Sequence, residues 1–319
     1  MNQNKIRRRT FLKTTSMAAL GATISTAFQA KAAEPISSGT GRRIGFVDFN
    51  LENYHANVFL QALRGPLESR GFTVAGAIGM KTTESRAWAE KNKISYFEND
   101  AALNEAVDFF MVLAPSNPEV HLDLCQRIVP FGKPTYVDKT FAPNLAIARE
   151  IFALADQHGT ALQTSSSLRY TNVQDEVAKA APSKVNHMIT WGGGGSFDEY
   201  AIHPIELLIS VMGHEVAGMM RRGTPESSQL LVEFSGGRTG VVNVFPKTNT
   251  PFAANFTTDK ETRHIEVDAS KLFVNNQAAI LDFFAEGKTN IDRRESLAVM
   301  WLLDAARGPH SLKGFVKKR

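Results

Sequence analysis

The residues most suited to acid–base chemistry lie in the stretch FDEYAIHPIELL, residues 197–208. Glu199 and His203 are four positions apart, and His203 and Glu206 three apart, so one helical face carries all three if a helix extends that far. An imidazole between two carboxylates could accept the proton of an alcohol. A metal is weakly indicated, because His-x-x-Glu with one further carboxylate is a poor ligand set, and we expect none. A solvated helix start with Pro204 in its first turn is the structural alternative.

A second candidate is the stretch YVDKTFAP, residues 136–143. Asp138 and Lys139 end an expected strand, so the lysine ammonium would point into the crevice at the carboxyl ends of the strands. There it could donate to a substrate hydroxyl or take its proton. An ordinary exposed loop lysine is the alternative.

A third stretch, LAPSNPEVH, covers residues 113–121, where a strand ends and a helix begins. Pro115 and Asn117 fit either a backbone ledge beside a bound cofactor or an ordinary strand-to-helix turn. Cys125, in the helical run that follows, is the single cysteine, so no intrachain disulfide can form. We expect Cys125 to be a buried helix residue and not a nucleophile.

An α/β fold is expected to position these stretches. From residue 42 to about 165, short apolar runs alternate with amphipathic segments of helix length. This pattern is typical of parallel strands joined by right-handed crossovers in a doubly wound sheet. The expected strands are 43–47, 73–78, 109–113, 135–137 and 161–164, and the expected helices are 55–69, 82–92, 118–130 and 144–158.

After about residue 168 the pattern changes to consecutive β-like runs, with a hairpin turn expected at Gly236-Gly237. The β-like runs are 184–193, 216–223, 227–237, 238–247 and 263–269, and the helices are 202–213, 276–287 and 293–308. We therefore expect a Rossmann-like nucleotide-binding domain over residues 42–167. An α+β domain with a large open antiparallel sheet is expected over residues 168–319.

Residues 1–32 indicate an export signal. The basic run RRRTFLK (7–13) precedes a mildly apolar stretch, too short and polar to span a membrane, and an Ala-Lys-Ala site with cleavage expected before Ala33. The order Arg-Arg-x-Phe-Leu-Lys is typical of the twin-arginine signal, and an ordinary basic start is the alternative. A periplasmic location follows. Removing the six Lys/Arg of this segment lowers the formal net charge from +4 to −2, which removes the main support for nucleic-acid binding.

The turn after the first strand, IGFVDFNLENYH (44–55), lacks the glycines that a dinucleotide-binding fold places there. Asp48 and Asn50 fall at two of the glycine positions. A carboxylate about 4 Å from a phosphate costs about 1 kcal/mol in water and ~4 kcal/mol in a partly screened cleft. The turn therefore conflicts with the nucleotide fold that surrounds it.

The three stretches, in this order behind a Rossmann-like start, resemble the Gfo/Idh/MocA family of sugar and cyclitol oxidoreductases. The resemblance covers nearly the whole chain after the signal. Residues 107–143 are similar to the family stretch that ends in a Glu-Lys-Pro motif, which reads Asp-Lys-Thr at 138–140 here. DEYAIHPIELL is similar to the family motif Asp-x-Gly-x-His-x-x-Asp. The positions that carry this motif are Glu199, Ala201, His203 and Glu206.

The resemblance implies hydride transfer between a sugar, polyol or glycoside hydroxyl and a tightly held NAD(P). Lys139 would orient or protonate that hydroxyl, and His203 would take its proton, with Glu199 at the acid position. The C-terminal sheet would form the interface of a homo-oligomer. The implied substrate contacts are Arg169, Glu206 and Tyr200, although Arg169 is equally consistent with a structural bridge between the domains. The implied cofactor contacts are Asn50, His55, Lys81, Thr82, Pro115, Asn117 and Asp138.

Lys81 and Thr82 stand where NAD-preferring enzymes place an acid for the ribose diol, which slightly favours NADP unless Glu84 substitutes. The missing glycines favour a competing hypothesis, a cofactor-free periplasmic carbohydrate-binding or accessory protein on the same scaffold. A metal-dependent lyase or isomerase is a weaker alternative. In every case the expected partners are a small carbohydrate and the twin-arginine export machinery.

Overall fold

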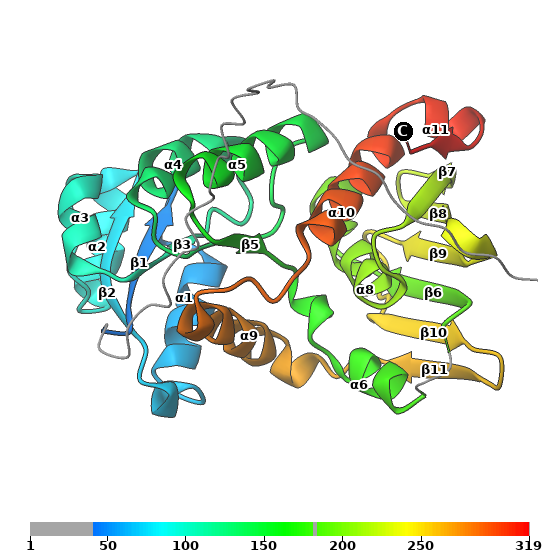
Figure 1. Cartoon of the computed structure of the whole chain (residues 1–319), viewed down its shortest axis with the longest axis horizontal. Helices are drawn as coiled ribbons and strands as arrows, with labels where there is room; N and C mark the ends of the chain where they lie inside the picture. The colour runs from blue at the N-terminus through cyan, green and yellow to red at the C-terminus, as the bar shows by residue number, and fades with distance from the viewer. Residues whose placement is uncertain (1–40, 181–183, 319) are drawn as a thin grey trace, which may run out of the picture. The chain divides into compact units, whose positions relative to one another are not determined.

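The computed structural model describes residues 41–180 and 184–318, so the expected export signal lies outside the described residues. Five parallel strands form the first sheet, in the order β2-β1-β3-β4-β5 (Figure 1). The reversal of strand order beside β1 confirms the doubly wound sheet expected from the alternating pattern. The strands are β1 (Arg43–Asp48), β2 (Thr73–Gly79), β3 (Phe109–Val112), β4 (Thr135–Val137) and β5 (Leu162–Thr164).

Asparagine caps start three of the helices that pack on this sheet. The side chains of Asn53, Asn99 and Asn144 each accept a hydrogen bond from the amide three residues on, which satisfies an otherwise free helix donor. The helices are α1 (Tyr54–Leu63), α2 (Thr82–Lys91), α3 (Asp100–Ala106), α4 (His121–Ile128) and α5 (Leu145–His158). Helix α3 was not expected, because seven residues with one buried leucine give too little periodicity to read.

The second sheet has seven strands in the order β11-β10-β6-β9-β8-β7-β12. We expected an antiparallel sheet, and this was wrong for one pair, since β6 and β9 run parallel. The hairpin at Gly236-Gly237 joins β8 to β9 as expected. Strands β7, β8 and β9 are antiparallel neighbours, and β6, which precedes them in the chain, pairs with β9 in the parallel direction. The strands are β6 (His187–Gly192), β7 (Val216–Thr224), β8 (Ser227–Phe234), β9 (Thr239–Val244), β10 (Ala253–Thr257), β11 (Thr262–Glu266) and β12 (Val316–Lys317).

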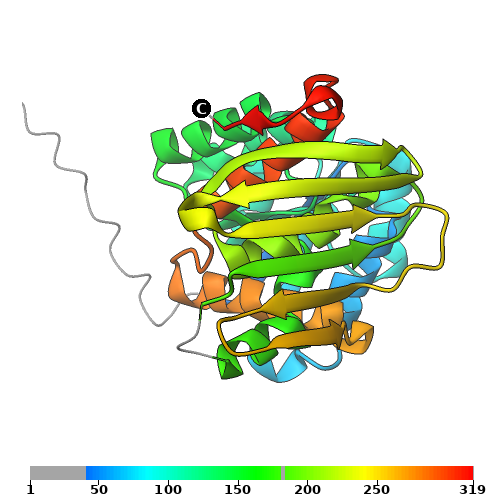
Figure 2. The same ribbon diagram turned by 90° about the vertical axis from the view of Figure 1, so that its right-hand side faces the viewer.

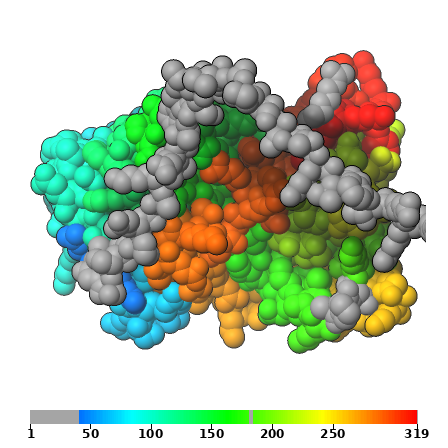
Figure 3. Space-filling view, in the orientation of Figure 1, coloured from blue at the N-terminus to red at the C-terminus, as the bar shows by residue number. Residues whose placement is uncertain are grey.

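Helices cover one face of this sheet, and the face toward the viewer in Figure 2 carries no described helix. The helices after residue 168 are α6 (Asn172–Lys179), α7 (Phe197–Tyr200), α8 (Ile202–Met212), α9 (Leu272–Glu286), α10 (Arg293–Arg307) and α11 (His310–Lys313), and of these α6, α8, α10 and α11 contact strands of this sheet. Two of them also reach the first sheet's helices: α9 packs on α1, beside which it lies at the surface in Figure 3, and α10 packs on α5. Helices α9 and α10 therefore connect the part of the chain that carries the first sheet with the part that carries the second.

Within residues 41–180 and 184–318, no helix combines the length and apolar character needed to cross a bilayer. The same residues contain no group of three or more His, Cys, Asp or Glu side chains placed to hold a metal ion.

Candidate active site

A cavity of about 210 Å³ lies where the carboxyl end of β4 meets α1, α8 and α9. Its walls combine aromatic side chains with a few polar groups, which is typical of a small-molecule site. The lining residues are Tyr54, His55, Phe59, Asp138, Lys139, Ser167, Leu168, Tyr200, His203, Phe252, Leu272, Phe273 and Asn276. Sequence regions far apart in the chain therefore contribute to one site.

Lys139 enters the cavity from the loop that follows β4. The side chain is largely buried, and its Nζ atom donates to the backbone carbonyl of Pro115 at 3.3 Å. That carbonyl belongs to the loop after β3, so the expected ledge at Pro115 holds the ammonium in place. An ammonium with further N–H donors can hold a ligand oxygen and stabilise negative charge on it.

His203 faces the cavity from the first turn of α8. Its Nδ1 atom lies 2.7 Å from the hydroxyl of Ser166, which leaves Nε2 on the side that the ring presents to the cavity. Burial lowers the pKa of His203 to about 3, and the charges of Lys139 and His55 lower it as well. His203 is therefore a neutral imidazole at physiological pH, ready to accept a hydrogen bond or a proton.

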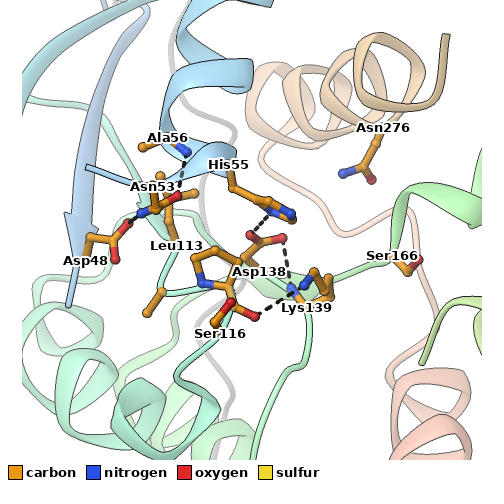
Figure 4. A network of polar contacts seen from close by, with 12 residues as sticks. Asp48, Asn53, His55, Ala56, Leu113, Ser116, Asp138, Lys139, Ser166 and Asn276 are labelled. Atoms are coloured by element: carbon orange, nitrogen blue, oxygen red, sulfur yellow. Dashed lines mark hydrogen bonds and ion pairs between the residues drawn. The ribbon is translucent and has the colours of Figure 1, made fainter. Parts of the chain in front are cut away.

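His55 and Asp138 form a close pair, which Lys139 separates from Ser166 in Figure 4. The Nδ1 atom of His55 lies 2.5 Å from Oδ2 of Asp138. Burial raises the pKa of Asp138, but the nearby charge and hydrogen bond of His55, together with Lys139, lower it by more. Asp138 is thus an ionised carboxylate, which fixes the orientation of the His55 ring and can stabilise an imidazolium.

A buried polar network supports this pair from behind. The Tyr136 hydroxyl lies 3.3 Å from Asp138 Oδ1 and 3.0 Å from the carbonyl of Ser165, and the Ser165 hydroxyl donates to Asn276 Oδ1 at 2.8 Å. Asn276 lines the cavity from α9. Sequence reasoning missed Asn276 and Ser166. A polar residue on the buried face of an amphipathic helix was the signal available for Asn276.

Three further expected residues lie at or near the cavity: Tyr200 as a substrate contact, Glu199 as a catalytic acid and Asn117 as a cofactor contact. Tyr200 lines the cavity, with its ring centroid 5.8 Å from that of His203. Glu199 is exposed and accepts from the Ser116 hydroxyl at 3.4 Å, which links α7 to the loop after β3. Asn117, one residue further along that loop, donates to Glu119 at 2.9 Å. Glu199 and Asn117 are thus near the site but do not line its cavity.

Arg169 and Glu206 contact each other instead of lining the cavity. Arg169 Nε lies 2.5 Å from Glu206 Oε1, and its Nη1 lies 2.5 Å from Glu295 Oε2. Burial lowers the pKa of Arg169, but the two carboxylates raise it by more. These contacts tie the segment after β5 to α8 and α10, which matches the structural bridge considered for Arg169.

The turn between β1 and α1 tests whether a dinucleotide fits. Asp48 is buried, and its carboxylate accepts from the Asn53 side chain at 2.8 Å and from the amide of Asn50 at 3.1 Å. Burial raises the pKa of Asp48 to about 7, although these hydrogen bonds lower it. The carboxylate therefore fills the inside of the turn.

Five amides in and beside this turn also have acceptors, whereas those of Tyr54 and His55, the first two of α1, have none among the described residues. A pyrophosphate needs free backbone N–H groups at the start of the helix. The amides and their acceptors are Asn50 to Asp48 (3.1 Å), Leu51 to Ser85 Oγ (3.2 Å), Glu52 to Asn50 Oδ1 (3.0 Å), Asn53 to the Leu51 carbonyl (2.8 Å) and Ala56 to Asn53 Oδ1 (3.0 Å). Asp48 and the paired amides fill the part of the turn where the glycines of a dinucleotide site would stand, so these residues do not fit a pyrophosphate bound there.

The expected ribose contacts lie away from the cavity. Lys81 and Thr82 are exposed, and Lys81 Nζ stands 5.3 Å from the centre of the Phe49 ring. The Lys81 amide donates to the Phe49 carbonyl at 2.8 Å, so the loops after β1 and β2 are joined to each other. Asn50 contributes its side chain to the turn itself, whereas His55 points into the cavity.

The residues that form the first sheet and its helices match a known protein family. Residues 44–166 match the model of an oxidoreductase family with an NAD-binding Rossmann fold, Gfo/Idh/MocA. A search of curated proteins finds no matching sequence. The resemblance to this family is thus confirmed over residues 44–166.

Solved structures show the same fold over most of the chain. A probable dehydrogenase from Thermotoga maritima superposes with a TM-score of 0.74 at 14% identity, covering 86% of this chain and 98% of its own. UDP-N-acetylglucosamine 3-dehydrogenase from Acidithiobacillus ferrooxidans gives 0.71 at 11%, covering 85% and 97%. Apo scyllo-inositol dehydrogenase from Lactobacillus casei gives 0.72 at 12%, covering 86% and 97%. At these identities the likeness shows the fold.

Proposed function

We propose that this chain, whose residues 44–166 belong to the Gfo/Idh/MocA oxidoreductase family, acts on a hydroxyl-bearing carbon of a sugar, polyol or glycoside. Lys139 would hold the reacting oxygen and His203 would move its proton. The observation that carries this proposal is that these two side chains, far apart in sequence, line one small cavity. The similar folds of an inositol dehydrogenase and a sugar-nucleotide dehydrogenase support the substrate class.

We propose a distinct task for each of the two residues. Lys139 keeps its ammonium against the Pro115 carbonyl and directs its remaining N–H groups into the cavity, where they would bind an oxygen as negative charge develops on it. His203 is neutral, and when its Nδ1–H donates to Ser166, the Nε2 lone pair can accept the proton of the bound hydroxyl. Asn276 and Tyr200 add polar contacts that suit a ligand with several hydroxyl groups.

Hydride transfer to a tightly held NAD(P), with NADP slightly favoured, was the expectation from the sequence. The family binds a nicotinamide dinucleotide. In this chain the turn that should carry the pyrophosphate is filled by Asp48 and Asn53. We therefore propose that the cavity residues transfer protons, and this proposal does not depend on a bound nicotinamide.

A second candidate function is supported by that same turn. A cofactor-free carbohydrate-binding or accessory protein would need the cavity and its polar lining but no nucleotide. In that case Lys139 and His203 would form hydrogen bonds with ligand hydroxyls, and the ligand would leave unchanged.

A ligand screen tests the proposal and separates the two functions. The full chain would be titrated by calorimetry with pyranosides, inositols and their ketones, and each mixture, with and without added NAD or NADP as the hydride acceptor, would be analysed by NMR for conversion. We expect one of these classes to bind, and His203→Asn and Lys139→Met to weaken binding or conversion at least tenfold. His310→Asn, on exposed α11, is the matched control. Binding without conversion would favour the second function, and absence of binding by the whole panel would overturn both.

We also propose that the protein is exported folded to the periplasm, as the sequence order at 7–13 indicates. Replacing Arg8 and Arg9 together by lysine should leave the protein in the cytoplasm, which cell fractionation would measure. Export of the double variant at the wild-type level would contradict twin-arginine transport.

A homo-oligomer through the second sheet is proposed as well. Half-buried apolar side chains form a cross-strand row on the face without described helices, and the row is Met220, Leu231, Val241 and Ile189. A row of this kind on an open sheet suits packing against a second copy. Leu231→Lys should then convert the assembly to monomers in light scattering, and an unchanged mass would argue against this interface.

A further inference from the structure

His55 has the surroundings of a reactive imidazole, although the proposed proton transfer does not use it. It stands in the first turn of α1 and lines the cavity with a side chain that is 12% exposed. The ring is packed edge-on by Phe59 and Phe273, with ring centroids 5.8 and 5.3 Å away. Aromatic neighbours on two sides limit the rotation of the ring.

Asp138 completes this arrangement. Its second oxygen accepts from the Lys139 amide at 2.8 Å, so the carboxylate is held while Oδ2 contacts His55 Nδ1. A buried carboxylate on one imidazole nitrogen leaves the other nitrogen directed at the ligand, which is the arrangement of an acid–base pair.

His203 lines the same cavity as this pair. Its partner Ser166 lies apart from His55 and Asp138 in Figure 4, with Lys139 between them. Burial lowers the pKa of His203 most, and the nearby charges of Lys139 and His55 lower it further. Lys139, with its ammonium, lines the same cavity. Two imidazoles therefore face one ligand, with a cation beside it.

We infer that His55, held by Asp138, is a second catalytic acid–base residue, and that together with His203 it catalyses redox-neutral proton transfer at the carbon beside a carbonyl of a keto sugar or keto polyol. This inference rests on the substrate class of the proposed function. It also removes the need for a dinucleotide, which the filled turn at Asp48 and Asn53 does not accommodate.

The step balances without an oxidant. One imidazole takes the proton from the carbon next to the carbonyl, and the C–H electron pair forms the carbon–carbon double bond of an enediolate. The carbonyl oxygen receives the negative charge, which the Lys139 ammonium stabilises. The other imidazole, after taking up a proton from solvent, passes it to carbon, and the first releases its proton to solvent, so that the carbonyl re-forms and both imidazoles end neutral.

Deuterium exchange would test this assignment. The full chain would be incubated in D₂O with keto-inositols and keto-pyranosides, and proton NMR would follow the loss of the signal beside the carbonyl. We expect exchange with the wild-type protein and a loss of at least about 100-fold in His55→Asn. Binding of the same ketone, measured by calorimetry, should remain within a few-fold.

Two further variants keep the test decisive. Asp138→Asn should reduce exchange in the same way, and His310→Asn should exchange like the wild-type protein. Thermal unfolding of His55→Asn and His55→Gln identifies the variant that remains folded. Exchange at the wild-type rate in a folded His55 variant, or a ketone bound by the wild-type protein without exchange, would overturn the inference and leave the proposed function standing. Failure of the whole panel to bind would overturn both.

Discussion

The Nδ1 atom of His55 lies 2.5 Å from Oδ2 of Asp138, which ties the first turn of α1 to the residue that follows β4. A glycine-rich turn would keep this place free for a cofactor. Here the turn is closed by its own side chains, and the helix start instead delivers an imidazole to the cavity. The turn without glycines therefore places an imidazole, paired with a carboxylate, in the wall of the cavity.

Asp138→Asn should lower turnover by about 10²–10⁴-fold while ligand affinity changes little. An amide keeps the shape of the side chain but cannot stabilise an imidazolium, and it can present an N–H to Nδ1. Steady-state kinetics with the ligand identified by the screen would measure kcat and KM separately. Asp282→Asn, in an exposed ion pair with Arg70, is the control that should behave like the wild-type protein.

His203 should stay neutral well below the usual range of histidine. Its pKa is lowered to about 3, chiefly by burial, so nitrogen NMR of the folded protein should show an unprotonated ring at pH 5. The assignment can be made by comparison with His203→Asn. A protonation midpoint near 6.5 would show that the ring is solvated and would weaken its role as the neutral acceptor.

The buried Asp48 should make the protein less stable as the pH rises. Its pKa is about 7 in the folded state against 3.8 in the unfolded state, so the folded state holds the extra proton between these values. The stability is fully present below about pH 4 and is lost toward pH 7, by up to about 1.4 kcal/mol per pH unit. Urea unfolding of wild type and Asp48→Asn from pH 4.5 to 7.5 would measure the difference. Parallel stability curves for the two proteins would contradict the prediction.

Glu206→Gln should destabilise the fold by about 3–5 kcal/mol, because it leaves the Arg169 guanidinium buried with one of its two carboxylates missing. Urea unfolding measures the effect. The surface pair of Arg293 and Asp156 provides the comparison, since Asp156→Asn should cost less than about 1 kcal/mol. Equal effects of the two substitutions would mean that the Arg169 pair is solvated.

Local pattern was sufficient for much of the fold. The strands of the first sheet follow from apolar runs bounded by turn residues, and β4 has the expected bounds, 135–137. Strand β10 was missed because Ala253 and Asn255 have low β propensity, and its place is set by pairing with β6 and β11. The parallel pairing of β6 with β9 is likewise a tertiary choice that no short stretch of sequence encodes.

The site was predictable in part for the same reason. Lys139 and His203 could be placed because each ends or begins an element whose position the fold class dictates. The pairing of His55 with Asp138 depends on the path of the turn between β1 and α1, which Asp48 and Asn53 close through side-chain hydrogen bonds. Arg169 and Glu206 turn toward each other because burial leaves each needing a charged partner. Neither relationship follows from spacing along the chain.

The nucleotide content of the natively exported protein is the most direct measurement of whether this cavity works without a dinucleotide. The protein would be purified from the periplasm, denatured, and its supernatant analysed by mass spectrometry, and the intact protein would be titrated with NAD and NADP. With Asp48 and Asn53 filling the turn, we predict no stoichiometric release and no binding of either nucleotide. Release of about one NAD or NADP per chain would contradict this, and would restore hydride transfer as the function of the Lys139 and His203 site.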